Sequence, residues 1–333
     1  MLLKLINEFP AALEQDWNSL LSKTEHHVPF LRYEYLKLWW QHRGGGEWDN
    51  GSQLKIITAE NNGQLVGIAP LFINEERLLL LGSIEVSDYL DLIAPQETMA
   101  AFVDALLPFL DREVEGWRTL DLYNVLEDSA SLPALKASAD RMGWSFAQEE
   151  YQPSPHITLP DDWETYLAGI NKKQRHEIRR KLRRAENAEL AVEWYVLQDG
   201  VRLDDEMQEF FKLMLFDEEK VSFLTPEMKD FMQQTARCAF DAGCLHLSFL
   251  TIDGKKAAGY LAFDYLNRIW LYNSGMSLDF REYSAGWVAL ANLIQWCIEN
   301  GRSELDFMRG NEDYKYRFGG VNRHVMRAVV TRK

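Results

Sequence analysis

The strongest constraint on the fold lies in residues 245–274, where the sequence takes on the alternation of apolar and polar residues typical of β-strands. Three strand-like runs cover 245–253, 257–265 and 268–274, and the short turns Asp253-Gly254 and Leu266-Asn267 separate them. Turns of this length join strands that run in opposite directions. The segment therefore predicts an antiparallel meander.

The first half of the chain also mixes helices with strands. We expect a helix first, then two strands joined by the hairpin signal Asn61-Asn62-Gly63, a third strand, a second helix and a last strand. These elements are expected at 32–41, 54–59, 65–72, 78–81, 100–110 and 119–123. The sequence YQPSP at 151–155 favours extended chain, because its two prolines oppose a helix. A domain boundary there would give two α/β (α+β) domains, 1–152 and 156–333.

The second half adds helices on both sides of the meander. Asp161 and Asp162 are good N-caps for an apolar stripe over 163–170. Further stripes with helical spacing follow, and a last buried strand is expected near the C-terminal end. These elements cover 203–214, 226–240, 287–298 and 305–308. Gly301 is placed to end the helix before that last strand.

A run of basic residues at 172–184 holds eight of the 36 Lys and Arg residues of the chain. In a helix, Arg175 and Arg179 are like-charged neighbours one turn apart, and such a pair costs roughly 0.2–0.5 kcal/mol. An anionic ligand would relieve this repulsion, so we interpret Arg175, Arg179 and Arg180 as binding phosphate groups of a substrate. The alternative is a solvated basic face whose aliphatic stems lie on apolar surface.

Charge and composition exclude several classes of protein. Residues 1–150 carry 11 Lys+Arg and 24 Asp+Glu, a net −13, and the remaining 25 and 27 give −2. No whole domain is basic, so we expect no DNA partner and a small-molecule ligand. The three cysteines are scattered and the histidines form no metal-like cluster, so no metal is predicted. Without an apolar run long enough for a membrane span or a signal peptide, a cytoplasmic protein is expected.

A loop at 281–286 precedes the helix expected over 287–298. Ser284, Ala285 and Gly286 are small enough for a ligand to approach the backbone, and free N–H groups at a helix start attract anions. The alternative is that Ser284 simply caps an ordinary helix. The pattern Arg281-x-x-Ser284-x-Gly286 resembles the R/Q-x-x-G-x-G/A loop of the GNAT superfamily of N-acyltransferases, which cradles the pyrophosphate of acyl-coenzyme A. Ser284 departs from that pattern, where glycine is usual.

A closer resemblance covers most of residues 155–320. The basic helix, the Ser-x-Gly helix start and the segment 306–315 look like the acetyltransferase family typified by the cellulose-biosynthesis-associated CelD/BcsL proteins, which are relatives of the FemAB peptidyltransferases. The segments 65–71, 81–82 and 87–91 resemble the N-terminal half of such proteins. The resemblance implies tandem GNAT-like domains, each a mixed and largely antiparallel sheet flanked by helices. The first domain would be degenerate, and the second would bind an acyl-CoA, such as acetyl-CoA.

Polar residues after the last strand are the candidates for catalysis. Transfer to an amine needs a base, an acid for the leaving group and stabilisation of negative charge. Asp306 and Glu312 are candidates for the base, Tyr314 for the general acid and Lys315 for charge stabilisation. The alternative is that Asp306 with Arg309, and Glu312 with Lys315, form ordinary loop ion pairs. The aromatic residues Trp270, Tyr272 and Trp287 are interpreted as core residues, or else as the lining of an acyl channel.

These observations predict an N-acyltransferase that moves an acyl group, acetyl in the simplest case, from acyl-CoA to an amine. The acceptor would be a sugar, a sugar nucleotide or an amino-acid-like molecule in polysaccharide or cell-envelope biosynthesis. One alternative is a FemAB-type transferase that takes its group from aminoacyl-tRNA, in which case the basic helix would contact RNA. Another is a binding module that keeps the fold without turnover.

Overall fold

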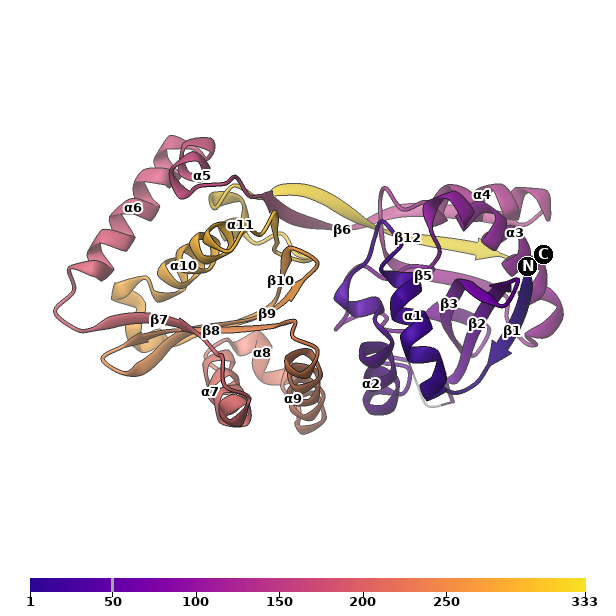
Figure 1. Cartoon of the computed structure of the whole chain (residues 1–333), viewed down its shortest axis with the longest axis horizontal. Coiled ribbons are helices and arrows are strands. Elements are labelled where there is room, and N and C mark those ends of the chain that lie inside the picture. Colours follow the sequence, from indigo (N-terminus) through magenta and orange to yellow (C-terminus); the bar gives the residue numbers. More distant parts are fainter. Residues whose placement is uncertain (49–50) are drawn as a thin grey trace. The chain divides into compact units, whose positions relative to one another are not determined.

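The computed structural model describes residues 1–48 and 51–333, which form two compact units (Figure 1). Unit 1 consists of Met1–Pro153 together with Arg323–Lys333, and unit 2 is Ser154–Asn322. The domains expected from the sequence, 1–152 and 156–333, place the C-terminal strand in the second domain. The structure places Arg323–Lys333 in unit 1, because the strand β12 (Val321–Thr331) pairs antiparallel with β5 (Thr119–Leu126).

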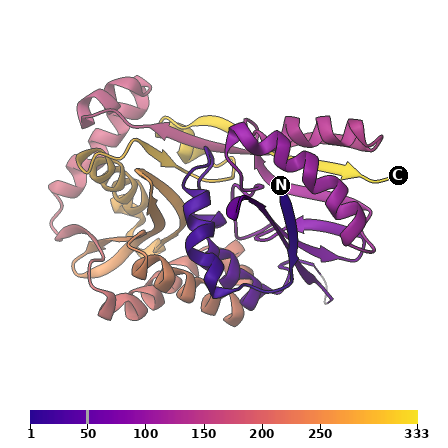
Figure 2. The same ribbon diagram turned by 45° about the vertical axis from the view of Figure 1, so that its right-hand side comes forward.

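Unit 1 is a mostly antiparallel sheet with helices packed against it (Figure 2). Its strands are hydrogen-bonded in the order β1-β2-β3-β4-β5-β12. Of these described neighbours, β4 and β5 are parallel and the other pairs are antiparallel. The first four strands are β1 (Leu2–Ile6), β2 (Gln53–Asn61), β3 (Gln64–Asn74) and β4 (Arg77–Leu80). The helices are α1 (Glu14–Leu21), α2 (Tyr33–Arg43), α3 (Gln96–Glu113) and α4 (Ser131–Arg141). The strand β6 (Ser145–Thr158) leads from unit 1 into unit 2.

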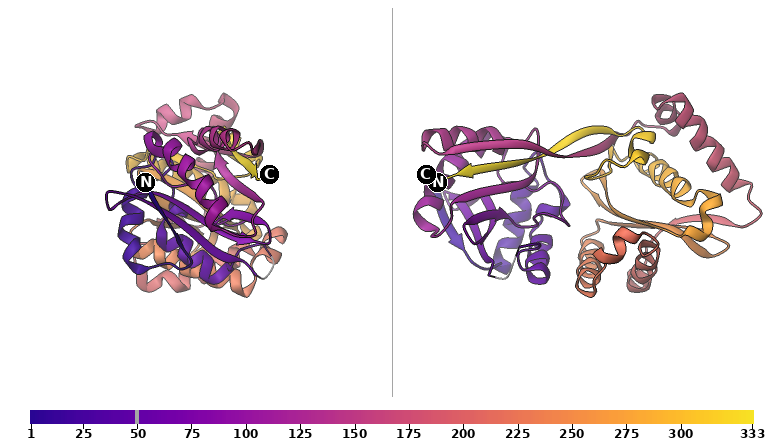
Figure 3. Two further views of the ribbon diagram at one scale, coloured as in Figure 1. Left: turned by 90° about the vertical axis from the view of Figure 1, so that its right-hand side faces the viewer. Right: turned by 180° about the vertical axis from the view of Figure 1, so that it is seen from behind.

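Unit 2 is built on the antiparallel meander β8-β9-β10, continued by β7 on one side and by β11 and the end of β6 on the other. These strands are β7 (Val192–Val196), β8 (Leu245–Ile252), β9 (Lys255–Tyr265), β10 (Arg268–Met276) and β11 (Glu304–Asp306). The helices are α5 (Trp163–Gly169), α6 (Lys172–Glu186), α7 (Leu203–Met214), α8 (Glu218–Phe223), α9 (Pro226–Asp241), α10 (Ala285–Glu299) and α11 (Asp313–Arg317). Figures 1 and 3 show α10 on one face of the meander and α7 with α9 on the other.

Most of the predicted elements are confirmed. The meander has the predicted strands and turns, and the hairpin of β2 and β3 turns at Asn62 and Gly63, both with positive φ. Asp162 caps α5, since its carboxylate accepts a hydrogen bond of 2.9 Å from the N–H of Thr165. The fold class, a mixed and largely antiparallel sheet flanked by helices, is therefore the one that the sequence predicts.

The prediction that a helix comes first is wrong, because the strand β1 precedes α1. β1 pairs with β2, and the ammonium of Lys4 lies 2.7 Å from the carboxylate of Glu60 on that strand. The predicted last strand, 305–308, is also shorter in the structure. It ends at Asp306, and Met308 takes a positive φ of 62° in the loop that follows.

One apolar core fills the space between the meander and α10 in unit 2. Along α10, Val288, Leu290, Leu293, Ile294 and Cys297 are buried, which explains why this helix is apolar over most of its surface. Helix α6 packs on α10 through Ile178 and Ala185, the two buried residues of an otherwise charged helix. In the described part of the chain, no helix is long and apolar enough to span a membrane.

His246 on β8 is a buried titratable group in this core. Its ring lies edge-on to that of Trp296, with 4.5 Å between the ring centroids, and its Nε2 has no hydrogen-bond partner among the described residues. Burial lowers the pKa of His246 to about 4, because the charged imidazolium would lose its hydration. The folded protein therefore holds this histidine neutral.

We predict that His246 makes unit 2 less stable in mild acid. The unfolded chain binds a proton as the pH falls below the ordinary histidine pKa, and the folded chain does so only near pH 4, so stability is lost as the pH falls between these values. Between pH 7 and pH 5 the loss should be about 2 kcal/mol. Urea unfolding at both pH values should show a correspondingly smaller loss for His246→Phe. Equal losses in the two proteins would contradict the prediction.

Candidate functional site

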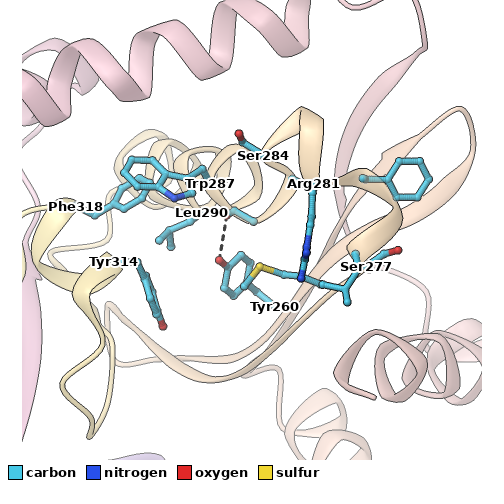
Figure 4. Close-up of a pocket in the computed structure, with 13 residues that line it drawn as sticks. Tyr260, Ser277, Arg281, Ser284, Trp287, Leu290, Tyr314 and Phe318 are labelled. Carbon is cyan, nitrogen blue, oxygen red and sulfur yellow. Dashed lines mark hydrogen bonds between the residues drawn. The ribbon is translucent and has the colours of Figure 1, made fainter. Parts of the chain in front are cut away.

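A cavity of about 400 Å³ lies in unit 2 beside the first turn of α10 (Figure 4). Its walls come from β9, the end of β10, the short 3₁₀ segment Leu278–Tyr283, the start of α10 and the segment around α11. Most of the lining is apolar or aromatic. The lining residues are Tyr260, Met276, Ser277, Leu278, Phe280, Arg281, Ser284, Ala285, Gly286, Trp287, Leu290, Tyr314 and Phe318.

The cavity lies where two strands of unit 2 stop pairing. β10 follows β9 as far as Met276, but it pairs with β11 only from Arg268 to Trp270. Beyond Trp270 one edge of β10 therefore has no partner in β11, and the chain after β11 turns away into α11. Met276 on β10 and Tyr314 on α11 both line the cavity, so the cavity lies between that free edge and α11.

The loop before α10 has the backbone geometry that an anion-binding site needs. Ser284 has φ = 55° and ψ = 43°, the left-handed conformation that glycine adopts most easily. Its side chain makes no capping hydrogen bond, so the alternative of an ordinary side-chain N-cap is wrong. The N–H groups of Ala285 and Gly286, in the first turn of a 15-residue helix, have no hydrogen-bond partner within the described chain.

Gly286 is closely packed in this first turn. A Cβ atom there would collide with the Sδ of Met276, which lines the same cavity. The hydroxyl of Tyr260 donates a hydrogen bond of 3.1 Å to the carbonyl oxygen of Gly286 (Figure 4). This bond ties β9 to the start of α10 and fixes one wall of the cavity.

Tyr314 is the one predicted catalytic residue that lines the cavity. Burial, and to a lesser degree the nearby carboxylate of Glu312, raises the pKa of Tyr314 well above its usual value. Burial likewise raises the pKa of Tyr260. Both phenols therefore stay protonated at neutral pH and are hydrogen-bond donors. A protonated phenol at the cavity wall fits the role of general acid that the sequence suggested for Tyr314.

Asp306 ends β11, Glu312 caps α11 and Lys315 lies in α11, and none of the three lines the cavity. Asp306 is fully buried, and its Oδ1 accepts a hydrogen bond of 2.7 Å from the N–H of Met308. Lys315 is 2% exposed, and its ammonium donates to the carbonyl oxygens of Met308 and Arg309 at 3.1 and 2.8 Å. The carboxylate of Glu312 lies 2.9 Å from the same ammonium, so Glu312 and Lys315 do form a loop ion pair.

The basic helix α6 is less self-repelling than its sequence suggests, because each predicted phosphate-binding arginine has a partner in the protein. Arg180 forms a two-pronged contact with Glu177 at 2.9 and 2.7 Å, and Arg179 pairs with Glu164. Arg175 reaches the carbonyl oxygens at the end of α5 at 3.3 and 3.4 Å. None of the three lines the cavity, so the structure does not bring them together with Ser284 and Gly286.

A different cation of α6 reaches the cavity wall. The Nζ atom of Lys181 lies 3.7 Å from the centroid of the Trp287 ring, a cation–π contact, and Trp287 packs on Phe318 with 4.8 Å between ring centroids. Trp287 thus lines the cavity, whereas Trp270 is a core residue with 1% exposure. Sequence reasoning missed Tyr260, Phe318 and Lys181, because their proximity depends on how distant segments pack.

Comparison with known proteins shows which families and folds the chain resembles. Residues 172–316 match the family model described as an acetyltransferase (GNAT) domain. The crystal structure of FemX is similar to the whole chain, with a TM-score of 0.66, 12% identity and coverage of 98% of this chain and 97% of that one. A search of curated proteins finds no match.

Two further solved structures resemble the chain. One is the C-terminal domain of a putative lysylphosphatidylglycerol synthetase from Agrobacterium fabrum, with a TM-score of 0.58, 12% identity and coverage of 97% and 92%. The other is a tandem GNAT protein from the clavulanic acid biosynthesis pathway, with a TM-score of 0.50, 12% identity and coverage of 98% of each chain. Residues 172–316 thus resemble a GNAT acetyltransferase domain, and the chain shares its fold with FemX and with a tandem GNAT protein. The match to the family model supports acyl transfer as the class of reaction.

We predict that Ser284→Gly stabilises the protein. Glycine adopts the left-handed conformation of residue 284 without the steric cost that serine incurs, and Ser284 makes no capping bond that would be lost. The free energy of unfolding should rise by about 1 kcal/mol. Ser277→Gly is the matched control, since Ser277 has φ = −73° and its hydroxyl accepts from the N–H of Asp279, so its loss should destabilise. A stability loss in Ser284→Gly would contradict the prediction.

We predict that Lys315→Met disrupts the loop before α11. The substitution leaves the carbonyl oxygens of residues 308 and 309 and the carboxylate of Glu312 without their shared cation. Two enclosed carbonyl oxygens left without their charged donor should lower the free energy of unfolding by about 2–3 kcal/mol. Denaturant unfolding is the measurement, with the exposed Lys255→Met as control. An unchanged stability would show that Lys315 is not needed for the loop, and would favour the purely catalytic role that the sequence suggested.

Proposed function

We propose that this protein is an N-acyltransferase that moves an acyl group from acyl-CoA to an amine of a sugar, sugar nucleotide or amino-acid-like acceptor. The observation that carries the proposal is the cavity itself. It combines a helix start with free N–H groups, a left-handed loop residue and a protonated tyrosine within one apolar space. Acetyl is the simplest transferred group, and the match to an acetyltransferase domain over 172–316 supports it.

The residues around the cavity fit a thioester of this kind. The N–H groups of Ala285 and Gly286 point along the axis of α10 and suit the pyrophosphate of the donor. Arg281 is exposed at the rim of the cavity, where its guanidinium can pair with a phosphate. The apolar side chains of Leu290, Trp287 and Phe318 suit the part of the donor that carries no charge.

Transfer forms a bond between the acceptor nitrogen and the carbonyl carbon of the thioester and breaks the bond from carbon to sulfur. The nitrogen loses a proton, and the departing thiolate gains one. Tyr314 is the proposed donor of that proton, because it lines the cavity and stays protonated. Glu312, whose side chain is 56% exposed, is better placed than the enclosed Asp306 to receive the proton of the acceptor. For Lys315 we propose that it holds the loop that carries both groups.

A second candidate donor is an aminoacyl-tRNA. The similarity in fold to FemX and the exposed residues Lys172, Lys173, Arg183 and Arg184 on α6 favour this donor. RNA bound through several phosphates would dissociate steeply as salt is added, whereas a single nucleotide would show a weaker dependence. A binding module without turnover is the third candidate, and it would bind an acceptor amine without consuming any thioester.

We predict that Arg281→Gln weakens binding of coenzyme A. Loss of a charge-assisted hydrogen bond to a phosphate should raise the Kd about 10-fold or more, and the affinity of the variant should depend less on salt. Isothermal titration with coenzyme A measures both. Arg237→Gln is the control, since Arg237 bonds Asp204 and the carbonyl oxygen of Gly200 and does not line the cavity. Equal Kd values for wild type and Arg281→Gln would refute the assignment of the phosphate site.

A further inference from the structure

Lys220 contacts the edge of β10 that has no partner in β11. It has had no part in the proposed transfer so far. It comes from α8, and its Nζ donates a hydrogen bond of 2.5 Å to the carbonyl oxygen of Ser274 and one of 3.0 Å to the Oδ1 of Asn273. The N–H of Ser274 donates to the same Oδ1 at 2.9 Å. Both backbone groups of Ser274 are thus bonded to side chains on this edge.

Lys220, Asn273 and Ser274 do not line the cavity themselves, but neighbouring residues of the same two strands do. Ser274 lies opposite Tyr260 in the β9–β10 ladder, and Tyr260 lines the cavity. Met276, two residues further along the same edge, also lines it. β11 no longer pairs with β10 at this level, so the edge that Lys220 contacts has no partner in β11. The carboxylate of Glu312, two residues before Tyr314, is close enough to Lys220 to raise its pKa, so the ammonium faces the segment that carries Tyr314.

The surroundings of Lys220 leave part of its ammonium for a ligand. Burial lowers the pKa of Lys220, and the carboxylates of Asp217 and Glu312 oppose that shift. An ammonium group has three N–H donors, and Asn273 and Ser274 account for two of them. Among the described residues the third N–H has no hydrogen-bond acceptor, so it is left for a ligand. In Lys315, by contrast, the backbone carbonyl oxygens and Glu312 occupy the whole group.

We propose that Lys220 is a catalytic residue that donates its third N–H to the carbonyl oxygen of the bound thioester and stabilises the negative charge that forms there. This inference rests on the proposed acyl transfer. As the acceptor nitrogen bonds to the carbonyl carbon, an electron pair moves onto the oxygen. It returns when the carbon–sulfur bond breaks, and the thiolate takes up a proton as the nitrogen loses one. A donor fixed in a site from which water is excluded is worth more than one in solution.

The test uses acetyl-CoA as donor and hydroxylamine as a simple acceptor, with the release of coenzyme A thiol followed in single turnovers. Lys220→Met should lower the rate about 100-fold, while the Kd of coenzyme A stays within about 2-fold of wild type. Lys220→Arg keeps a cation at the edge and should retain most of the rate. Lys212→Met removes an exposed lysine from α7 and should change neither quantity.

The pH profile separates catalysis from a merely structural role. If the charged form is required, the wild-type rate falls as the pH rises through the pKa of Lys220, and this fall begins below the pH at which an ordinary lysine loses its proton. Lys220→Arg should remove the fall, since arginine keeps its charge. If Lys220 only covers the strand edge, Lys220→Met should have a lower melting temperature with an unchanged rate and pH profile. This outcome would overturn the catalytic role of Lys220 and leave the proposed acyl transfer standing.

The remaining outcomes concern the proposed function as well. A wild-type protein that binds no coenzyme A would overturn both proposals. One that binds coenzyme A and releases no thiol at any pH would overturn the transfer reaction and, with it, the role of Lys220. Melting curves for all variants show whether the compared proteins are folded.

Discussion

The site depends on the point at which β10 and β11 stop pairing. A parallel pair that continued to Met276 would satisfy the edge of β10 with backbone bonds and leave no room for a ligand. Because pairing ends at Trp270 and Asp306, β10 continues to Met276 without β11 beside it, and Met276 lines the cavity. The start of α10, held to β9 by the bond from Tyr260 to Gly286, encloses that space from one face of the sheet. At Ser274, the side chains of Asn273 and Lys220 bond the backbone N–H and carbonyl oxygen of this edge, so these groups need no neighbouring strand.

Much of this fold follows from local patterns in the sequence. The meander was predictable because short turns separate its strand-like runs, and Asp253, Gly254 and Asn267 in these turns are residues that a tight reversal favours. The strands β1 and β12 could not be predicted in this way, because only their pairing with distant strands identifies them. β12, for example, pairs with a strand about 200 residues earlier. Local pattern also suggested a loop suited to phosphate at 281–286, which stays a prediction. The structure shows that Ser284 in this loop has a positive φ, the conformation that glycine adopts most easily.

The remaining site residues depended on packing that a single sequence does not contain. Eight basic residues in thirteen positions suggest a binding surface, yet Glu164, from the preceding helix, and Glu177 pair with two of the three arginines singled out. Lys315 stands beside Tyr314 in sequence, but one lines the cavity and the other is enclosed by carbonyl oxygens. Lys220 occurs in the acidic segment Asp217-Glu-Glu-Lys220, which resembles a solvated helix start, and only the position of β10 shows what its ammonium meets.

The return of the chain into unit 1 has a consequence for biosynthesis. The sheet of unit 1 includes β12, so the unit is assembled from the first 153 residues and the last 11, with all of unit 2 encoded between them. During translation the first 153 residues leave the ribosome long before their final strand exists. Until unit 2 has been synthesised, the edge of β5 that later pairs with β12 stays unpaired. An unpaired strand edge can pair with other chains, so the nascent protein is prone to aggregation or depends on a chaperone during this period. Truncation at the boundary near residue 153 would leave this edge of β5 permanently unpaired. An isolated N-terminal unit therefore requires residues 323–333 to be joined to it.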